Sequence, residues 1–192
     1  MKIAVARDEA FNFTYRENID RLREIGEVIF FSPIHDKKLP LSPLLSPLIP
    51  ELRSPTRSLS SLLYLPGGYP EFFLKELSAN TSMLTSIHDY IEQGGRCLAE
   101  CGGMMYLCRH IIDEDGKSWP MASILPDDAT MQGKRLHLGY RDWLGFHGHE
   151  FHYSSIVGQP APYYIYKNLR ASYVHLYWGD KNILDLWKDF TP

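Results

Sequence analysis

The sequence predicts an α/β domain with a mostly parallel central sheet, and three observations support this fold class. A strand, an amphipathic helix and a second strand follow one another within residues 2–31. Further along, a short apolar segment ends in a cysteine that is followed by two glycines. Finally, 192 residues, of which 44% are hydrophobic, suit one domain with a substantial core. We therefore expect residues 1–192 to form a single domain.

The first elements follow from hydrophobic periodicity and from the positions of glycine. Lys2–Ala6 is apolar enough for a buried strand, and Tyr15–Ile25 carries apolar residues at helical spacing. Gly26 is suited to close that helix, and Glu27–Phe31 resumes strand character. Two strands joined by a helix form a βαβ unit, which implies a parallel sheet.

A segment of different character separates this unit from the next strand. Residues 39–61 recur in Pro, Ser and Leu, and prolines at this density disfavour both helix and central strand. We expect a surface loop or insertion there. The elements expected after it are a strand over Leu62–Leu65 and a helix over Met83–Ile91, with Asn80 as N-cap and Gly94 and Gly95 at its end.

The cysteine lies where a nucleophile is best exposed. Arg96–Glu100 is predicted as a strand and Gly102–Ile111 as a helix, so Cys101 occupies a sharp strand-to-helix turn. The same turn presents the serine of hydrolase nucleophile elbows. A thiolate at a helix N-terminus is stabilised by the helix dipole, so we expect a lowered pKa for Cys101.

The second half is richer in β-forming and aromatic residues. Its expected strands are Trp119–Ile124, Arg135–Trp143, His149–Ile156, Pro162–Lys167 and Ala171–Tyr177, followed by a short helix over Asn182–Lys188.

Charge and cysteine usage exclude several classes. The formal charge of −3 does not suggest nucleic acid or an anionic membrane as a partner, and no apolar run reaches the roughly 18 residues of a membrane span. The spacings of Cys97, Cys101 and Cys108 match no common zinc pattern, so we expect no metal and interpret Cys97 and Cys108 as core residues. Reduced thiols without an export signal indicate a cytoplasmic protein.

A cysteine nucleophile needs a base and donors for an oxyanion. The histidines of the β-rich half are the candidates for the base, and composition does not choose among them: His147, His149, His152 and His175. His149 and His152 would face opposite sides of a strand, which weakens a metal interpretation of that cluster. Gly67 and Gly68 follow a predicted parallel strand, so their amides, with that of Gly102, are candidates for an oxyanion hole.

These motifs resemble the C-terminal glutaminase domains of cobyrinic acid a,c-diamide synthases, in the cobalamin-pathway branch of class I glutamine amidotransferases. The resemblance covers nearly the whole chain in the family's order. The matching stretches are residues 3–13, 31–33, 66–71, 99–107, 138–140, 148–154 and 171–176.

The resemblance implies a flavodoxin-like domain that hydrolyses glutamine and delivers ammonia. The family's nucleophile falls on Cys101 and its histidine on His175. Classical relatives carry a glutamate two residues after that histidine, where this chain has Tyr177, so a Cys–His dyad is expected. The stretch with His149, Glu150 and His152 is a family hallmark, which we expect at the ammonia exit or partner interface.

The family's N-terminal synthetase half has no counterpart in this chain. That half binds ATP and the corrinoid, so no cofactor is expected in this domain, and ATP and Mg are expected on a synthetase partner. Two other functions stay open: a catalytically silent docking or regulatory module, and a cysteine hydrolase of the same fold acting on another amide. The acceptor also stays open, since another tetrapyrrole a,c-dicarboxylate would serve.

Overall fold

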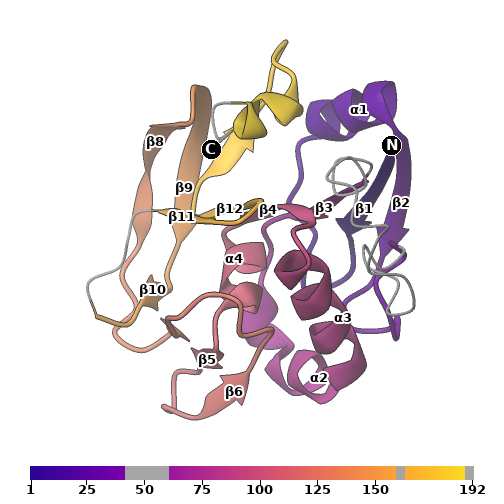
Figure 1. Ribbon diagram of the computed structural model, residues 1–192. Coiled ribbons are helices and arrows are strands. Elements are labelled where there is room, and N and C mark those ends of the chain that lie inside the picture. The colour runs from indigo at the N-terminus through magenta and orange to yellow at the C-terminus, as the bar shows by residue number, and fades with distance from the viewer. Residues whose placement is uncertain (42–60, 159–162, 189–192) are drawn as a thin grey trace.

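The computed structural model describes residues 1–41, 61–158 and 163–188. Its central sheet has six strands in the order β11-β12-β4-β3-β1-β2 (Figure 1). Neighbouring strands are parallel except β11, which pairs antiparallel with β12. The prediction of a mostly parallel α/β sheet is confirmed. In chain order the strands are β1 (Lys2–Ala6), β2 (Glu27–Phe31), β3 (Ser61–Leu65), β4 (Arg96–Glu100), β11 (Tyr163–Tyr166) and β12 (Leu169–Ser172).

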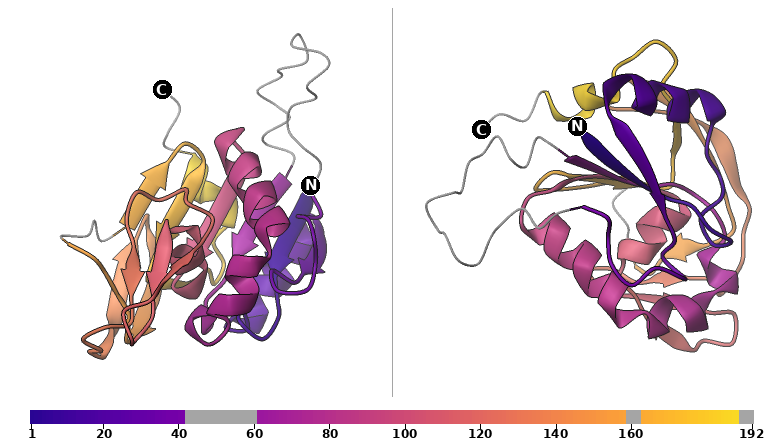
Figure 2. Two further views of the ribbon diagram at one scale, coloured as in Figure 1. Left: turned by 90° about the horizontal axis from the view of Figure 1, so that it is seen from below. Right: turned by 90° about the vertical axis from the view of Figure 1, so that its right-hand side faces the viewer.

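Both faces of this sheet are covered, which explains why its strands read as continuous apolar runs. In β1, Ile3 and Val5 pack on one side with α1 (Arg16–Ile25), whereas Ala4 and Ala6 belong to the core on the other side. Helices α3 (Thr81–Glu92) and α4 (Gly102–Leu107) cover that second side, and Figure 2 shows α1 and α3 on opposite sides of the strands.

The β-rich half adds two smaller sheets at one end of the central sheet (Figure 2). One has the order β10-β7-β5-β6 and the other, which is antiparallel, the order β13-β9-β8. Their strands are β5 (His110–Ile112), β6 (Ser118–Pro120), β7 (Ala129–Thr130), β8 (His137–Trp143), β9 (Phe146–His152), β10 (Ser155–Ile156) and β13 (His175–Tyr177). The remaining elements are η3 (Pro70–Phe72), α2 (Leu74–Ala79) and η4 (Ile183–Trp187).

The helix predicted over Gly102–Ile111 is too long, because the structure ends it at Leu107. The Leu107 carbonyl accepts hydrogen bonds from the amides of Ile124 and Leu125, and Ile111 pairs with Trp119 and Ala129. Backbone groups that a longer helix would have paired internally thus form hydrogen bonds with residues distant in the sequence. The spacing of apolar residues along the sequence does not reveal that exchange.

Three predicted strands also change. His149–Ile156 is divided between the end of β9 and β10, which belong to different sheets. Trp119–Ile124 contains only the end of β6, since Ser118–Pro120 is the paired segment. Ala171–Tyr177 is divided between β12 and β13, which belong to different sheets. The break lets the chain leave the central sheet before His175.

Gly26 and Asn80 lie at the predicted helix ends, but neither caps its helix in the way expected of it. Gly26 follows α1 with extended backbone, and a Cβ there would lie 2.3 Å from the Met1 carbonyl oxygen, so close packing rather than a left-handed turn requires glycine. Asn80 precedes α3, but its side chain does not cap the helix. It donates instead to the carbonyls of Pro33 and Asp36, which ties the loop after β2 to α3.

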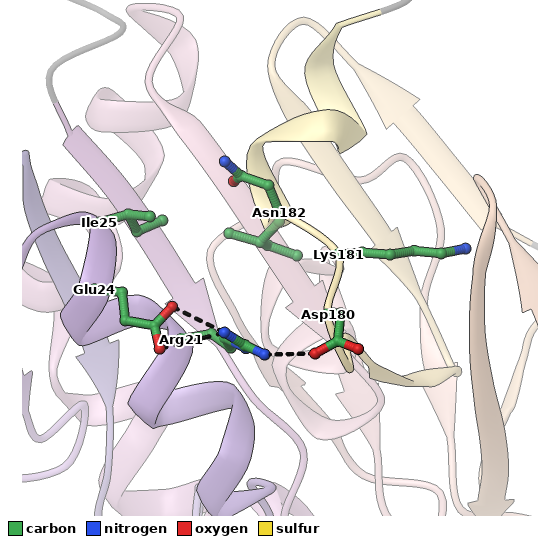
Figure 3. Close-up of a pocket in the computed structure, with 7 residues that line it drawn as sticks. Arg21, Glu24, Ile25, Asp180, Lys181 and Asn182 are labelled. Atoms are coloured by element: carbon green, nitrogen blue, oxygen red, sulfur yellow. Dashed lines mark hydrogen bonds and ion pairs between the residues drawn. The ribbon is translucent and has the colours of Figure 1, made fainter.

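Helix α1 holds the strand that carries His175. The buried Asn18 side chain donates to the Leu176 carbonyl and accepts from the Trp178 amide, as a neighbouring strand would. Beside it, the Arg21 guanidinium bonds Glu24 and Asp180 across a small pocket (Figure 3). These contacts connect the first βα unit to the end of β13.

Most of the predicted 39–61 loop lies outside the described residues, within which Leu39 and Leu41 are buried and Ser61 begins β3. Among the helices that the structure describes, none combines the length and apolar character required to cross a bilayer.

Candidate functional site

Cys101 stands at a strained turn between β4 and α4. Its backbone has φ +46° and ψ −109°, a conformation that non-glycine residues rarely adopt. The Cys101 amide donates to the Ser172 carbonyl at 2.8 Å, which fixes the turn to the end of β12. A Cβ on Gly103 would lie 2.1 Å from the Leu65 carbonyl oxygen, so the helix starts this close to β3 only with glycine. The predicted strand–turn–helix elbow is confirmed.

A cavity of about 250 Å³ opens beside this turn at the carboxyl ends of the central strands. It brings together the candidate nucleophile, the candidate base and one of the loop glycines. Its lining residues are Phe13, Gly68, Tyr69, Cys101, His149, Phe151 and His175.

The three candidate oxyanion glycines are packed closely around the elbow. A Cβ on Gly102 would lie 3.2 Å from the Gly68 nitrogen, so the two backbones meet without side chains between them. A Cβ on Gly67 would lie 2.1 Å from Cε1 of His175, so this glycine leaves room for the imidazole. Backbone amides at such a position are the usual donors to an oxyanion.

His175 is buried and held by aromatic neighbours. It lies directly opposite His149 on the pair β13–β9, and the two rings stack with centroids 5.2 Å apart. The Phe13 ring also contacts the His175 ring in an edge-to-face arrangement, with ring centroids 4.5 Å apart. Among the described residues the His175 Nδ1 has no hydrogen-bond partner. Tyr177, two residues later, is half exposed and contacts the Tyr15 ring.

The electrostatics of Cys101 differ from the sequence-based expectation. Burial raises the pKa of the thiol to about 12, and the carboxylates of Glu71, Glu100 and Glu150 act in the same direction. The Gly102 amide lowers this pKa, but its effect is smaller than that of burial. The predicted lowering of the thiol pKa is therefore wrong, because one short helix does not offset desolvation among acidic groups.

The candidate base is shifted in the opposite direction. Burial lowers the pKa of His175 to about 3, with smaller contributions from His149 and His152. At neutral pH the Cys101 thiol and the His175 imidazole, which line the same cavity, are therefore both uncharged.

The other residues of the family stretch have separate environments. His149 lines the cavity and its Nδ1 lies 2.8 Å from the Tyr15 hydroxyl. His152 is on the opposite face of β9, where its ring stacks on Tyr173 at 3.7 Å and its Nδ1–H donates to the Ser154 carbonyl. Glu150 forms an ion pair with Arg141. Within the described part of the chain, no group of three His, Cys, Asp or Glu side chains is placed to hold a metal ion.

Sequence reasoning gave no role to Phe13, Tyr15 or Glu100. The two aromatic residues follow β1 at the sheet edge where ligands bind, a position that could have drawn attention to them. Glu100 is the last residue of β4 and is completely buried, and only the structure shows what it contacts.

The fold and the elbow define an α/β domain with a cysteine at a strand-to-helix turn, and its architecture is similar to that of a solved glutamine amidotransferase. A solved structure described as a glutamine amidotransferase superposes with a TM-score of 0.55 at 16% identity, covering 90% of this chain and 89% of that one. At this identity the comparison supports the fold alone.

Sequence comparison identifies the family. The model of the CobB/CobQ-like glutamine amidotransferase domain matches residues 2–183, and the chain belongs to that family. It is 38% identical to a cobyrinate a,c-diamide synthase of Synechococcus, over 93% of this chain and 42% of the relative. A cobyrinate a,c-diamide synthase of Caldanaerobacter subterraneus is 36% identical over 92% of this chain and 42% of its own length. The chain thus spans less than half the length of these relatives.

Proposed function

We propose that this chain is the glutaminase component of a cobyrinic acid a,c-diamide synthase-like enzyme, and that Cys101 and His175 perform the hydrolysis. The observation that carries the proposal is the shared cavity, in which a strained cysteine elbow, a buried imidazole and the glycine backbone of Gly68 converge. Membership in the amidotransferase family supports glutamine as the substrate.

The proposed reaction starts from the neutral pair. Cys101 Sγ attacks the side-chain amide carbon of glutamine while His175 accepts the thiol proton. The amides of Gly68 and Gly102 stabilise the oxyanion. His175 then returns the proton to the leaving nitrogen, ammonia departs and a γ-glutamyl thioester remains. Water attacks the thioester with His175 again accepting a proton, which returns to Sγ as glutamate leaves.

The ammonia requires a partner that uses it. Ammonia is mostly protonated at neutral pH and is then not a nucleophile, so a covered route to an acceptor has a clear advantage. The curated relatives are more than twice as long as the matched region, which supports a synthetase domain or subunit that binds ATP, Mg and a corrinoid carboxylate.

We assign the docking of this partner to the exposed face of the β8–β9 hairpin. The cavity residues His149 and Phe151 lie opposite Tyr140 and Leu138, so one sheet face continues from the cavity to the edge strand β8. Tyr140 is 93% and Leu138 is 64% exposed. Large apolar side chains this exposed are typical of interaction surfaces.

The three buried free cysteines are compatible with the proposed cytoplasmic location.

One observation favours the alternative of a silent docking module. The third position of a classical triad, two residues after His175, holds Tyr177 instead of a glutamate. A protein that only docks would keep the fold and need no activation of the thiol.

Glutamate release from glutamine tests the proposal. The chain would be assayed alone and with the synthetase portion of a cobyrinate a,c-diamide synthase, beside Cys101→Ala and His175→Ala. We expect no turnover with Cys101→Ala and a loss of about 10²–10⁴-fold with His175→Ala. Absence of turnover in both conditions would favour the silent module. Faster hydrolysis of asparagine or another small amide would favour the different hydrolase.

A further inference from the structure

Glu100 is a buried acidic residue for which the proposed reaction has no direct use. It precedes Cys101 and is 1% exposed. Its Oε1 accepts a hydrogen bond of 3.1 Å from the Leu176 amide, and its Oε2 lies 2.8 Å from the Tyr64 hydroxyl, which donates to it. Leu176 is the residue directly after His175, so this carboxyl group connects the elbow to the strand of the candidate base.

A second hydrogen bond completes this connection. The Cys101 amide donates to the Ser172 carbonyl at 2.8 Å. Ser172 comes three residues before His175, and Leu176 comes one residue after it. The segment that carries His175 is therefore held at both ends by the adjacent residues Glu100 and Cys101.

The Leu176 contact is retained in either protonation state of Glu100. Burial raises the pKa of Glu100 to about 8, although the bonds from Tyr64 and Leu176 lower it. In the protonated acid, Oε1 still accepts from Leu176, while Oε2 carries the proton toward the Tyr64 oxygen. The neutral acid therefore accepts the hydrogen bond from the Leu176 amide without placing a negative charge next to the thiol.

An apolar side chain at this position would not do the same. Leu98, two residues earlier on the same face of β4, belongs to the core formed with Tyr64, Leu176 and Trp178. Replacing Glu100 with such a residue would avoid burying an acid but would remove the hydrogen-bond acceptor of the Leu176 amide, and an unsatisfied buried donor is destabilising.

We propose that Glu100 is a positioning residue that sets the place of His175 relative to Cys101 through the Leu176 amide. The inference rests on the proposed function, because a position relative to Cys101 matters only if that thiol reacts. Displacement of a reacting group by about 1 Å can reduce the rate by about 10²-fold, so the loss of one hydrogen bond that positions His175 can lower kcat strongly.

Three substitutions separate position from charge. Glu100→Gln resembles the protonated acid, with an oxygen toward Leu176 and an amide toward Tyr64, so we expect kcat within about threefold of wild type. Glu100→Asp keeps the carboxyl group but is too short to reach Leu176, and Glu100→Ala removes the acceptor. For both we expect kcat to fall about 10–100-fold with KM within about threefold, since the loss affects the reacting groups rather than glutamine binding.

Leu98→Ala is the matched control, because it opens a cavity on the same strand and face without removing a hydrogen bond. We expect it to lower thermal stability at least as much as Glu100→Ala while retaining kcat at a temperature where both are folded. Labelling of Cys101 by a glutamine-mimicking electrophile, measured on the same variants, provides a second rate. It applies where turnover by the isolated chain is slow.

The results distinguish the two proposals. Wild-type rates in Glu100→Asp, equal damage in Glu100→Gln and Glu100→Asp, or an equal loss of kcat in Leu98→Ala would each overturn the positioning role. If Glu100→Ala does not fold, the Gln and Asp variants decide. Unchanged glutamate release by Cys101→Ala would instead overturn the proposed function.

Discussion

His149 and His175 face each other directly across the antiparallel pair β9–β13, and their rings stack at 25° with centroids 5.2 Å apart. The Tyr15 hydroxyl holds His149 from the far side at 2.8 Å from Nδ1. No carboxylate among the described residues bonds the buried His175 Nδ1. Contacts with the rings of His149 and Phe13 therefore orient His175, as a triad carboxylate orients the histidine in other hydrolases.

Removal of the His149 ring should impair the proposed glutaminase. We expect His149→Ala to lower kcat for glutamate release about tenfold, since His175 gains freedom. His149→Phe keeps a flat ring at the contact and should retain more activity than His149→Ala. Wild-type kcat in the alanine variant, measured beside His175→Ala, would contradict this role.

A methyl group on Gly67 should displace the candidate base. The Cβ of Gly67→Ala would lie 2.1 Å from His175 Cε1, so we expect kcat to fall about 10²-fold and stability to fall about 1–3 kcal/mol. Gly139→Ala is the control, because its Cβ meets only the flexible Arg141 side chain. Equal kcat values for the two variants would contradict the expected displacement of His175.

The reactivity of Cys101 should depend on the reagent. With its pKa raised to about 12, the buried thiol should react with iodoacetamide at pH 8 more than about tenfold slower than a free thiol. A glutamine-mimicking electrophile fills the cavity and engages His175, so we expect it to label Cys101 faster than it labels a free thiol. Mass spectrometry of both reactions checks the prediction, and equally slow labelling by both reagents would favour the silent module.

Acid should destabilise the fold through His152. Burial lowers the pKa of His152 to about 4 in the folded protein, below the ordinary value of 6.5. The unfolded chain therefore takes up a proton first as the pH falls. The stability contributed by neutral His152 is fully present above pH 6.5 and is lost as the pH falls toward 4.

His152→Phe isolates this contribution, because it keeps a ring against Tyr173 and does not titrate. Denaturant unfolding between pH 7 and 4 should show a smaller loss of stability in the variant than in wild type. Contributions from His175, whose pKa is also lowered, and from Glu100, whose pKa is raised, occur in both proteins. Parallel curves for the two proteins would contradict the prediction.

The sequence predicted the main elements of the site well where local signals agreed. The apolar strand before Cys101 and the glycines after it predict an elbow because few sequences can form so tight a turn. The same signals misplaced the end of α4, since Ile111 continues the helical spacing of apolar residues while the strand partners of residues 110–112 come from residues 118–130. Periodicity records which residues are buried but not which backbone groups they meet.

By itself, the sequence determined the parallel sheet, the position of Cys101 at its edge and the family to which the chain belongs, because these depend on local turn chemistry and ordered motifs. The tertiary structure alone decided which histidines line the cavity beside the thiol, how Glu100 contacts Leu176 and in which direction the thiol pKa moves. Those properties depend on desolvation and on contacts between residues more than 70 positions apart, such as Glu100 and Leu176.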